Sequence, residues 1–117
     1  MTCQQHDPIQ MMVQMTIRPE AHIFALAMEE RLRSNDVKGG WEHLTPTLLL
    51  SRLLEEAGEL AREIRHLEEV DPTPEEAMSV RKEAADVANY AMMIADNYGD
   101  LKAIREAHSR LFSGPME

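Results

Sequence analysis

The chain has a single cysteine, Cys3, and few aromatic residues. The first shortage bears on the cellular compartment and the second on the type of secondary structure. One cysteine cannot form an internal disulfide, so we expect a protein of a reducing compartment, the cytoplasm. Phe, Trp and Tyr together make up only 4% of the residues, whereas Ala, Leu, Met and Glu are plentiful. This balance favours helices over sheets.

Positive charge is also scarce: 12 Lys and Arg residues stand against 21 Asp and Glu residues, which gives a net charge of −9. Contacts to nucleic-acid phosphates need clustered basic side chains, so we expect no nucleic-acid partner. An anionic ligand would need metal ions to bring positive charge. No apolar run reaches the roughly 18 residues of a membrane span, and no basic segment leads into an apolar one, so we expect neither a membrane span nor a signal peptide.

Helix signals predict one domain of the all-α class behind a short arm. Residues 1–18 show no helical period and are predicted to be an N-terminal arm, extended or disordered, while residues 19–117 form the domain. Thr45 before Pro46 is typical of a helix N-cap, and Thr73 opens a capping box. The pattern predicts four helices: Pro19 to about Arg33, Pro46 to about Val70, Pro74 to Gly99, and about Leu101 to Phe112.

Two matching hexapeptides lie in the second and third predicted helices. EAGELA begins at Glu56 and places Glu59 one turn later, and EAADVA begins at Glu83 and places Asp86 one turn later. At about 100° per residue, each acid pair lies at the border of an apolar stripe. The expected buried stripes are Leu50, Leu53, Leu54, Ala57, Leu60, Ala61, Ile64 and Leu67, and Val80, Ala84, Val87, Ala91 and Ile94. If the two helices pack antiparallel, the four carboxylates converge beside the shared core.

Acid pairs of this spacing also arise by chance, because 21 acids in 117 residues give roughly four of them, and most are simply solvated. The repeat in the same phase, with small residues between the acids, favours a functional interpretation. Four like charges held together are unfavourable without cations, and Mg²⁺ binds through carboxylates, water and substrate phosphates. Glu55 points about 100° away from Glu56, so it is either a solvated partner of Arg52 or an outer ligand or water-positioning base.

The EExxE motif at Glu55, Glu56 and Glu59, followed by ExxD at Glu83 and Asp86, resembles the all-α nucleoside triphosphate pyrophosphohydrolases of the MazG-like superfamily. The likeness covers roughly residues 20 to 100. It includes the loop KGGWEHLTP and the run DVANYAMMIAD, both of which are similar to bacterial and phage members. The resemblance implies a four-helix MazG-like bundle.

The same resemblance implies Mg²⁺-dependent hydrolysis of a (deoxy)nucleoside triphosphate to the monophosphate and pyrophosphate, with Mn²⁺ as a substitute cation. Such a cation neutralises and orients the triphosphate and lowers the pKa of a water. Three residues are assigned to catalysis: Glu55, Glu56 and Lys38. The metal ligands of the family carry over onto Glu56, Glu59, Glu83 and Asp86.

The nucleotide contacts follow in part from the resemblance. The base-stacking tryptophan of the family carries over onto Trp41, its basic phosphate contact onto Lys38, and its tyrosine one turn beyond the last acid onto Tyr90. From the residues alone, Trp41 is either a loop anchor or a base-stacking side chain. Tyr90 and Asn97 follow the stripe of acids and are expected to line the same cleft. Asn89 lies off that stripe and is a weaker candidate.

Two alternatives stay open at this point. One is a non-enzymatic helical interaction protein whose acids are merely solvated, and the other is a phosphoribosyl-ATP pyrophosphatase with the same chemistry on another substrate. Independently of function, the third helix between Ala84 and Ala95 is apolar almost all round, which is typical of a central helix. A chain this short cannot cover both sides of it, so we expect a bundle completed by dimerisation, as a homodimer or a tetramer of dimers.

Overall fold

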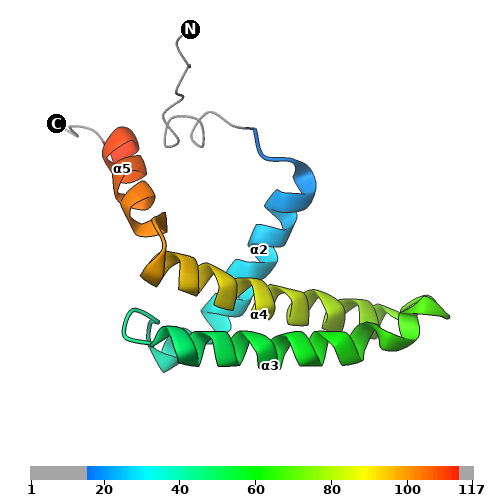
Figure 1. The fold of residues 1–117 in the computed structure, drawn as a ribbon. Coiled ribbons are helices and arrows are strands. Elements are labelled where there is room, and N and C mark those ends of the chain that lie inside the picture. The colour runs from blue at the N-terminus through cyan, green and yellow to red at the C-terminus, as the bar shows by residue number, and fades with distance from the viewer. Residues whose placement is uncertain (1–15, 114–117) are drawn as a thin grey trace, which may run out of the picture.

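The computed structural model describes residues 16–113, and they form four α-helices and two short 3₁₀ helices, with no strand in that range (Figure 1). The all-α class and the four predicted helices are thereby confirmed. The helices are α2 (Pro19–Ser34), η1 (Asp36–Lys38), α3 (Pro46–Ile64), η2 (Arg65–Glu68), α4 (Pro74–Tyr98) and α5 (Leu101–Ser113). The predicted N-terminal arm lies almost wholly outside the described residues. None of the described helices combines the length and the hydropathy needed to span a membrane.

The helix starts are set by the capping residues that the sequence indicates. The Thr45 hydroxyl accepts a hydrogen bond from the Leu48 amide at 3.2 Å. At α4, the Thr73 hydroxyl accepts from the Glu76 amide at 3.1 Å, and the Glu76 carboxylate accepts from the Thr73 amide at 2.9 Å. This reciprocal pair is a capping box, which satisfies two amides that lack a partner in the helix.

The end of the second predicted helix differs from the expectation. The α-helix stops at Ile64 rather than near Val70, and the chain continues as the 3₁₀ helix η2. His66 on η2 lies 2.8 Å from the Glu76 carboxylate at the start of α4. The last turn before the connection is therefore tightened into 3₁₀ geometry, as is common at helix ends.

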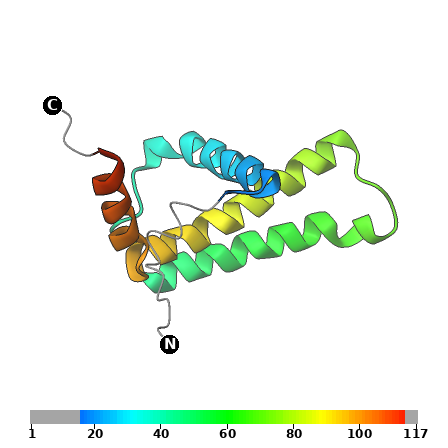
Figure 2. The same ribbon diagram turned by 90° about the horizontal axis from the view of Figure 1, so that it is seen from above.

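Helices α3 and α4 form a long antiparallel hairpin, which runs along the base of Figure 1. Helix α2 crosses α4, and Figure 2 shows it on the side of α4 away from α3. Helix α5 contacts the end of α4 and leads away from the hairpin. The second and third predicted helices thus lie side by side, as the convergence of the acids requires.

The described residues bury little in this single chain. The buried side chains are Leu49, Ala85, Asn89 and Asp96. Three large members of the expected stripe, Leu50, Leu54 and Ile64, are 50%, 60% and 44% exposed. Leu49 is therefore the buried centre of the inner side of α3, and no residue between 16 and 113 covers part of the predicted apolar stripe.

Candidate functional site

Three of the four predicted metal ligands meet between α3 and α4. Glu56 and Glu59 of α3 and Glu83 of α4 each offer a carboxylate oxygen, and these three oxygens lie within 4.8 Å of one another. All three residues are half-buried. The antiparallel hairpin brings them together, because each acid stands at the border of its helix beside the packed face. We call these three residues the glutamate cluster.

Crowding and partial burial disfavour negative charge on the cluster. The pKa of Glu56 is raised from 4.5 to about 8, first by burial, then by hydrogen bonding with Glu59 and Glu83, and then by the charges of Glu59 and Asp86. The Oε2 atom of Glu83 is buried and has no hydrogen-bond partner among the described residues. This oxygen therefore has a lone pair without a hydrogen-bond partner, and it lies beside two further carboxylates. Oxygen ligands of this kind suit a hard divalent cation.

Asp86, the fourth predicted ligand, lies beside the cluster but is paired with an arginine. Arg31 of α2 donates from Nε to Oδ1 at 2.9 Å and from Nη2 to Oδ2 at 3.0 Å. This bidentate contact raises the pKa of Arg31, and the charges of Glu83 and Glu56 add to the effect. The predicted quartet of acids is thus a trio plus an arginine–aspartate pair.

A cavity of about 490 Å³ opens where α2, the loop of residues 39–45, α3 and α4 meet. Its volume is typical of a pocket for a small organic ligand. Glu56 and Asp86 form part of its wall, and three cationic side chains, Arg31, Lys38 and Arg52, stand around it. An anionic ligand in this cavity would meet both the cations and, through a bound metal ion, the acids.

The aromatic side of the cavity consists of Trp41 and Tyr90. Trp41 is carried by a loop that turns at Gly39, whose φ of 92° is readily adopted only by glycine. The same turn separates Lys38 from Trp41 and lets both side chains line the cavity. A flat apolar group with a polar edge would suit this wall.

The Trp41 loop is fastened to the end of α4 by several hydrogen bonds. The indole Nε1–H donates to the Asp96 carboxylate at 3.0 Å, and Asp96, which is 6% exposed, also accepts a hydrogen bond from Arg105 of α5. Asn97 donates to the Trp41 carbonyl at 2.8 Å. Trp41 therefore lines the cavity and is also anchored, so its anchoring leaves base stacking as a prediction.

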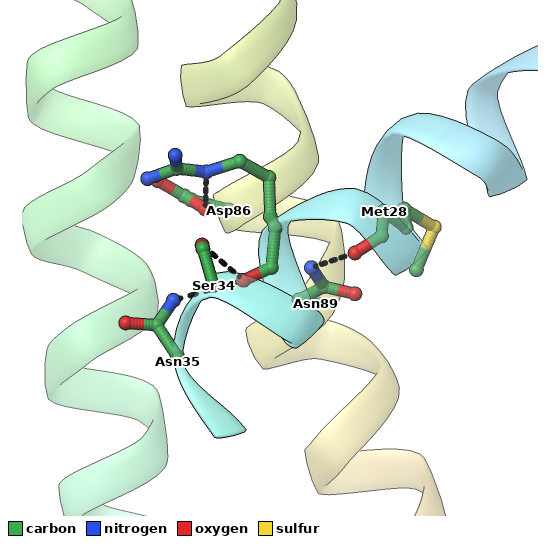
Figure 3. A network of polar contacts seen from close by, with 6 residues as sticks. Met28, Ser34, Asn35, Asp86 and Asn89 are labelled. Carbon is green, nitrogen blue, oxygen red and sulfur yellow. Dashed lines mark hydrogen bonds and ion pairs between the residues drawn. The ribbon is translucent and has the colours of Figure 1, made fainter. Parts of the chain in front are cut away.

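Asn89 ties α4 to α2. Its amide donates to the Met28 carbonyl at 3.0 Å, a contact that Figure 3 shows beside Asp86. Asn89 is only 4% exposed, and its Oδ1 atom is buried without a partner among the described residues. The sequence reading placed this residue off the inner stripe, whereas it lies on the inner side of α4 and contributes to the cavity wall.

The other predicted site residues take different places. Glu55 is exposed and lies in a second, shallow hollow on the outer side of α3, together with Gly58 and Glu59. Asn97 is not part of the cavity wall and instead holds the Trp41 loop. Six of the predicted residues do line the cavity: Lys38, Trp41, Glu56, Asp86, Asn89 and Tyr90.

The two arginines of the cavity wall, Arg31 and Arg52, are not among the predicted site residues. Arg52 precedes Glu56 by one turn on α3, so helical periodicity could have placed it on the same side. Arg31 had no such signal. Its position depends on how α2 crosses α4, which local sequence does not encode.

Comparisons with known proteins identify the family of the chain. A family model described as the MazG nucleotide pyrophosphohydrolase domain matches residues 44–105. A Bacillus subtilis (strain 168) protein, named the uncharacterized protein YvdC, is 36% identical over 89 residues, which are 68% of this chain and 84% of that protein. No solved structure matches the chain significantly. The matched span holds the glutamate cluster and Asp86, and with the relative's coverage it shows that the chain belongs to the MazG nucleotide pyrophosphohydrolase domain family.

Proposed function

We propose that this protein hydrolyses a (deoxy)nucleoside triphosphate to the nucleoside monophosphate and pyrophosphate, with Mg²⁺ held by the glutamate cluster. The family gives nucleotide pyrophosphohydrolysis as the general activity. The observation that carries the finer proposal is the cluster itself, with three carboxylate oxygens within 4.8 Å beside a cavity lined by cations and aromatic rings.

The donor set fits a hard divalent cation. Glu56, Glu59 and Glu83 offer only oxygen atoms, and one carboxylate oxygen, Oε2 of Glu83, is buried with no hydrogen-bond partner in the described part of the chain. Carboxylate ligands suit Mg²⁺ and also Mn²⁺ as a substitute. When bound, the cation supplies positive charge to the phosphates and promotes attack by water. Family members generally use divalent metals, and we assign Asp86 to the same site.

The triphosphate is proposed to lie across the mouth of the cavity, between the acids and the basic residues. Lys38 and Arg52 are exposed and line this cavity, so they can contact phosphate oxygens without a large desolvation penalty. These contacts orient the chain of phosphates, and orientation supplies much of the rate in phosphate chemistry.

The base is proposed to stack against Trp41, with Tyr90 on the same wall. Because Asp96 and Asn97 hold the Trp41 loop, the ring is oriented before the substrate arrives. Such preorganisation lowers the entropy lost on binding. Asn89 supports this wall through its bond to the Met28 carbonyl.

The attacking water is assigned to the α3 acids. Glu55 is exposed and lines the second hollow together with Glu59 of the cluster, so it can take up a proton released at the cluster and pass it to solvent. Glu56 is half-buried with a raised pKa, and it would lose its proton when a cation joins the cluster. We therefore assign proton acceptance to Glu55 and cation binding to Glu56.

We also propose that the working form is a homodimer or a tetramer of dimers. Leu50, Leu54 and Ile64 of α3 are 50%, 60% and 44% exposed in the single chain, and Ile23 and Leu26 of α2 are 63% and 58% exposed. Uncovered apolar side chains of this extent favour a protein interface.

The activity is tested by incubating the protein with Mg²⁺ and each common NTP and dNTP, together with phosphoribosyl-ATP, and separating the products. Equimolar pyrophosphate and monophosphate are expected, and EDTA should abolish them. Glu59→Gln should lower kcat/KM by roughly 10²-fold, because a charged ligand is lost while its shape is kept. Glu75→Gln, an exposed acid in the first turn of α4, is the matched control and should leave the rate unchanged.

Turnover of phosphoribosyl-ATP alone would reassign the substrate. If no nucleotide is hydrolysed, the proposal is wrong, and a helical interaction protein becomes the better description. If Glu59→Gln retains full Mg²⁺-dependent turnover, the protein is an enzyme but the assignment of its cation to the glutamate cluster is wrong.

A further inference from the structure

The ion pair between Arg31 and Asp86 occupies a place where the sequence predicts a metal ligand. The guanidinium engages both carboxylate oxygens, at 2.9 and 3.0 Å, and both residues line the cavity. The Arg31 and Asp86 side chains are 29% and 16% exposed. The pair is thus open to the cavity on one side, and its partners can exchange without unfolding of the helices.

The main chain of Arg31 is held independently of this pair. Its carbonyl oxygen accepts hydrogen bonds from Ser34 Oγ at 2.8 Å and from Asn35 Nδ2 at 3.0 Å, and Figure 3 shows both side chains beside the last turn of α2. One turn earlier, Asn89 holds the Met28 carbonyl from α4. The long Arg31 side chain can therefore leave Asp86 while α2 keeps its position.

A divalent cation and the guanidinium compete for the same carboxylate. Both Asp86 oxygens are engaged by Arg31, so a cation that uses Asp86 must displace at least one of the two hydrogen bonds. A cation bound to Asp86 would also be repelled by the positive charge of the guanidinium. In the absence of a cation, Arg31 supplies the positive charge that stabilises Asp86.

A displaced guanidinium has a suitable partner in the same cavity. A planar guanidinium fork matches the spacing of phosphate oxygens and binds them through two parallel hydrogen bonds. Lys38 and Arg52 stand around the same cavity, so a triphosphate placed there also lies within reach of Arg31.

We propose that Arg31 is a phosphate-binding residue that Asp86 holds in the free protein and releases to the triphosphate when a cation joins the acids. The inference rests on the proposed function. The nucleotide removes the competitor from Asp86, and the cation frees Arg31 for the nucleotide. Each ligand therefore tightens the binding of the other, which is positive coupling between the two.

The variant Arg31→Gln tests both roles of Arg31, because it should strengthen cation binding and weaken nucleotide binding. With Mn²⁺ alone, measured by titration calorimetry, the variant should bind about fivefold more tightly than the native protein, since a competing ion pair of this exposure is lost. With the nucleotide that is turned over best, KM should rise about tenfold with a smaller change in kcat, since a charged hydrogen-bond donor to phosphate is lost.

Arg33→Gln is the matched control. Arg33 lies two residues away on α2 and pairs with Glu29 on the exposed surface, where the two side chains are 75% and 53% exposed. Its Mn²⁺ affinity and KM should both stay native. Arg31→Lys keeps the charge but cannot make both bonds, so it should bind Mn²⁺ more tightly than the native protein by a smaller factor.

Unchanged or weaker Mn²⁺ binding by a folded Arg31→Gln would overturn the inference. If Arg31→Gln does not fold, a native-like Mn²⁺ affinity of Arg31→Lys would overturn the inference instead. Failure of the native protein to release pyrophosphate from any nucleotide refutes the proposed function instead. The Mn²⁺ measurement needs no nucleotide, so the two failures are distinguishable.

Discussion

Replacing Glu56 by Gln should stabilise the metal-free protein at high pH, although it removes a proposed metal ligand. The pKa of Glu56 rises from 4.5 to about 8 in the folded protein, chiefly through burial. A raised carboxyl pKa means that the folded state holds a proton which the unfolded state releases. Its contribution to stability is therefore fully present below pH 4.5 and is lost as the pH rises towards about 8.

The size of this effect follows from the same two pKa values. At about 1.4 kcal/mol per pKa unit, the difference between 4.5 and about 8 corresponds to a change of at most about 5 kcal/mol in the free energy of unfolding. Water and salt reach the half-buried cluster, so we expect about 2 kcal/mol in practice. For a domain of this size, that is a change of about 10 °C in Tm. Hydrogen bonds with Glu59 and Glu83 contribute to the raised pKa of Glu56, so the size of the effect depends on the whole cluster.

The assay is urea or thermal unfolding in EDTA from pH 5 to pH 9. Native stability should fall across this range, and Glu56→Gln should match the native protein at pH 5 but exceed it by about 2 kcal/mol at pH 9. Glu75→Gln, on the exposed first turn of α4, should follow the native curve. Adding Mg²⁺ at pH 9 should stabilise the native protein more than Glu56→Gln. Equal pH dependence in the native protein and in Glu56→Gln would refute the assignment of the proton to this cluster.

Three further predictions follow. Sedimentation at micromolar concentration should give a mass that is a multiple of the 13.3 kDa chain, whereas a stable monomer would contradict the proposed interface. Asp96→Leu should leave the Trp41 indole N–H unpaired, so emission from this single tryptophan should shift and KM should rise roughly fivefold with little change in kcat. Asp100 is exposed, so Asp100→Asn serves as the control. Native tryptophan emission in Asp96→Leu would show that Asp96 does not hold Trp41 in place. Thr73→Ala should lower the free energy of unfolding by about 1 kcal/mol, measured by urea denaturation, and no loss would mean that the capping box contributes little.

Helix starts could be predicted because their causes are local. The side chains of Thr45 and Thr73 bond to amides three residues further on, so a few letters of sequence contain the whole interaction. The end of α3 could not be predicted in this way. Its last turn is tightened where His66 contacts Glu76 across the connection, and such a contact depends on how the two helices meet.

The same distinction explains the site. The convergence of Glu56, Glu59 and Glu83 follows from helical periodicity and from one assumption, that α3 and α4 pack as an antiparallel hairpin. Because these two helices are neighbours in the sequence, the assumption is a simple one. The Arg31–Asp86 pair joins positions 55 residues apart, and the crossing of α2 over α4 decides it. Asn97 shows the limit of periodicity, because it follows the stripe of acids and yet serves the loop instead of the cavity.

The acidity of the chain and the small number of its buried residues have a common consequence. The glutamate cluster destabilises the cation-free fold, because burial and mutual repulsion raise the pKa of Glu56. A cation that binds only the folded state shifts the equilibrium towards folding by an amount that grows with its concentration. Native domains are in general stable by only about 5 to 15 kcal/mol, and the described residues bury little in one copy, so we expect this linkage to be a large share of the total stability. The residues proposed to bind the substrate's cation therefore also set how much of the protein is folded when that cation is scarce.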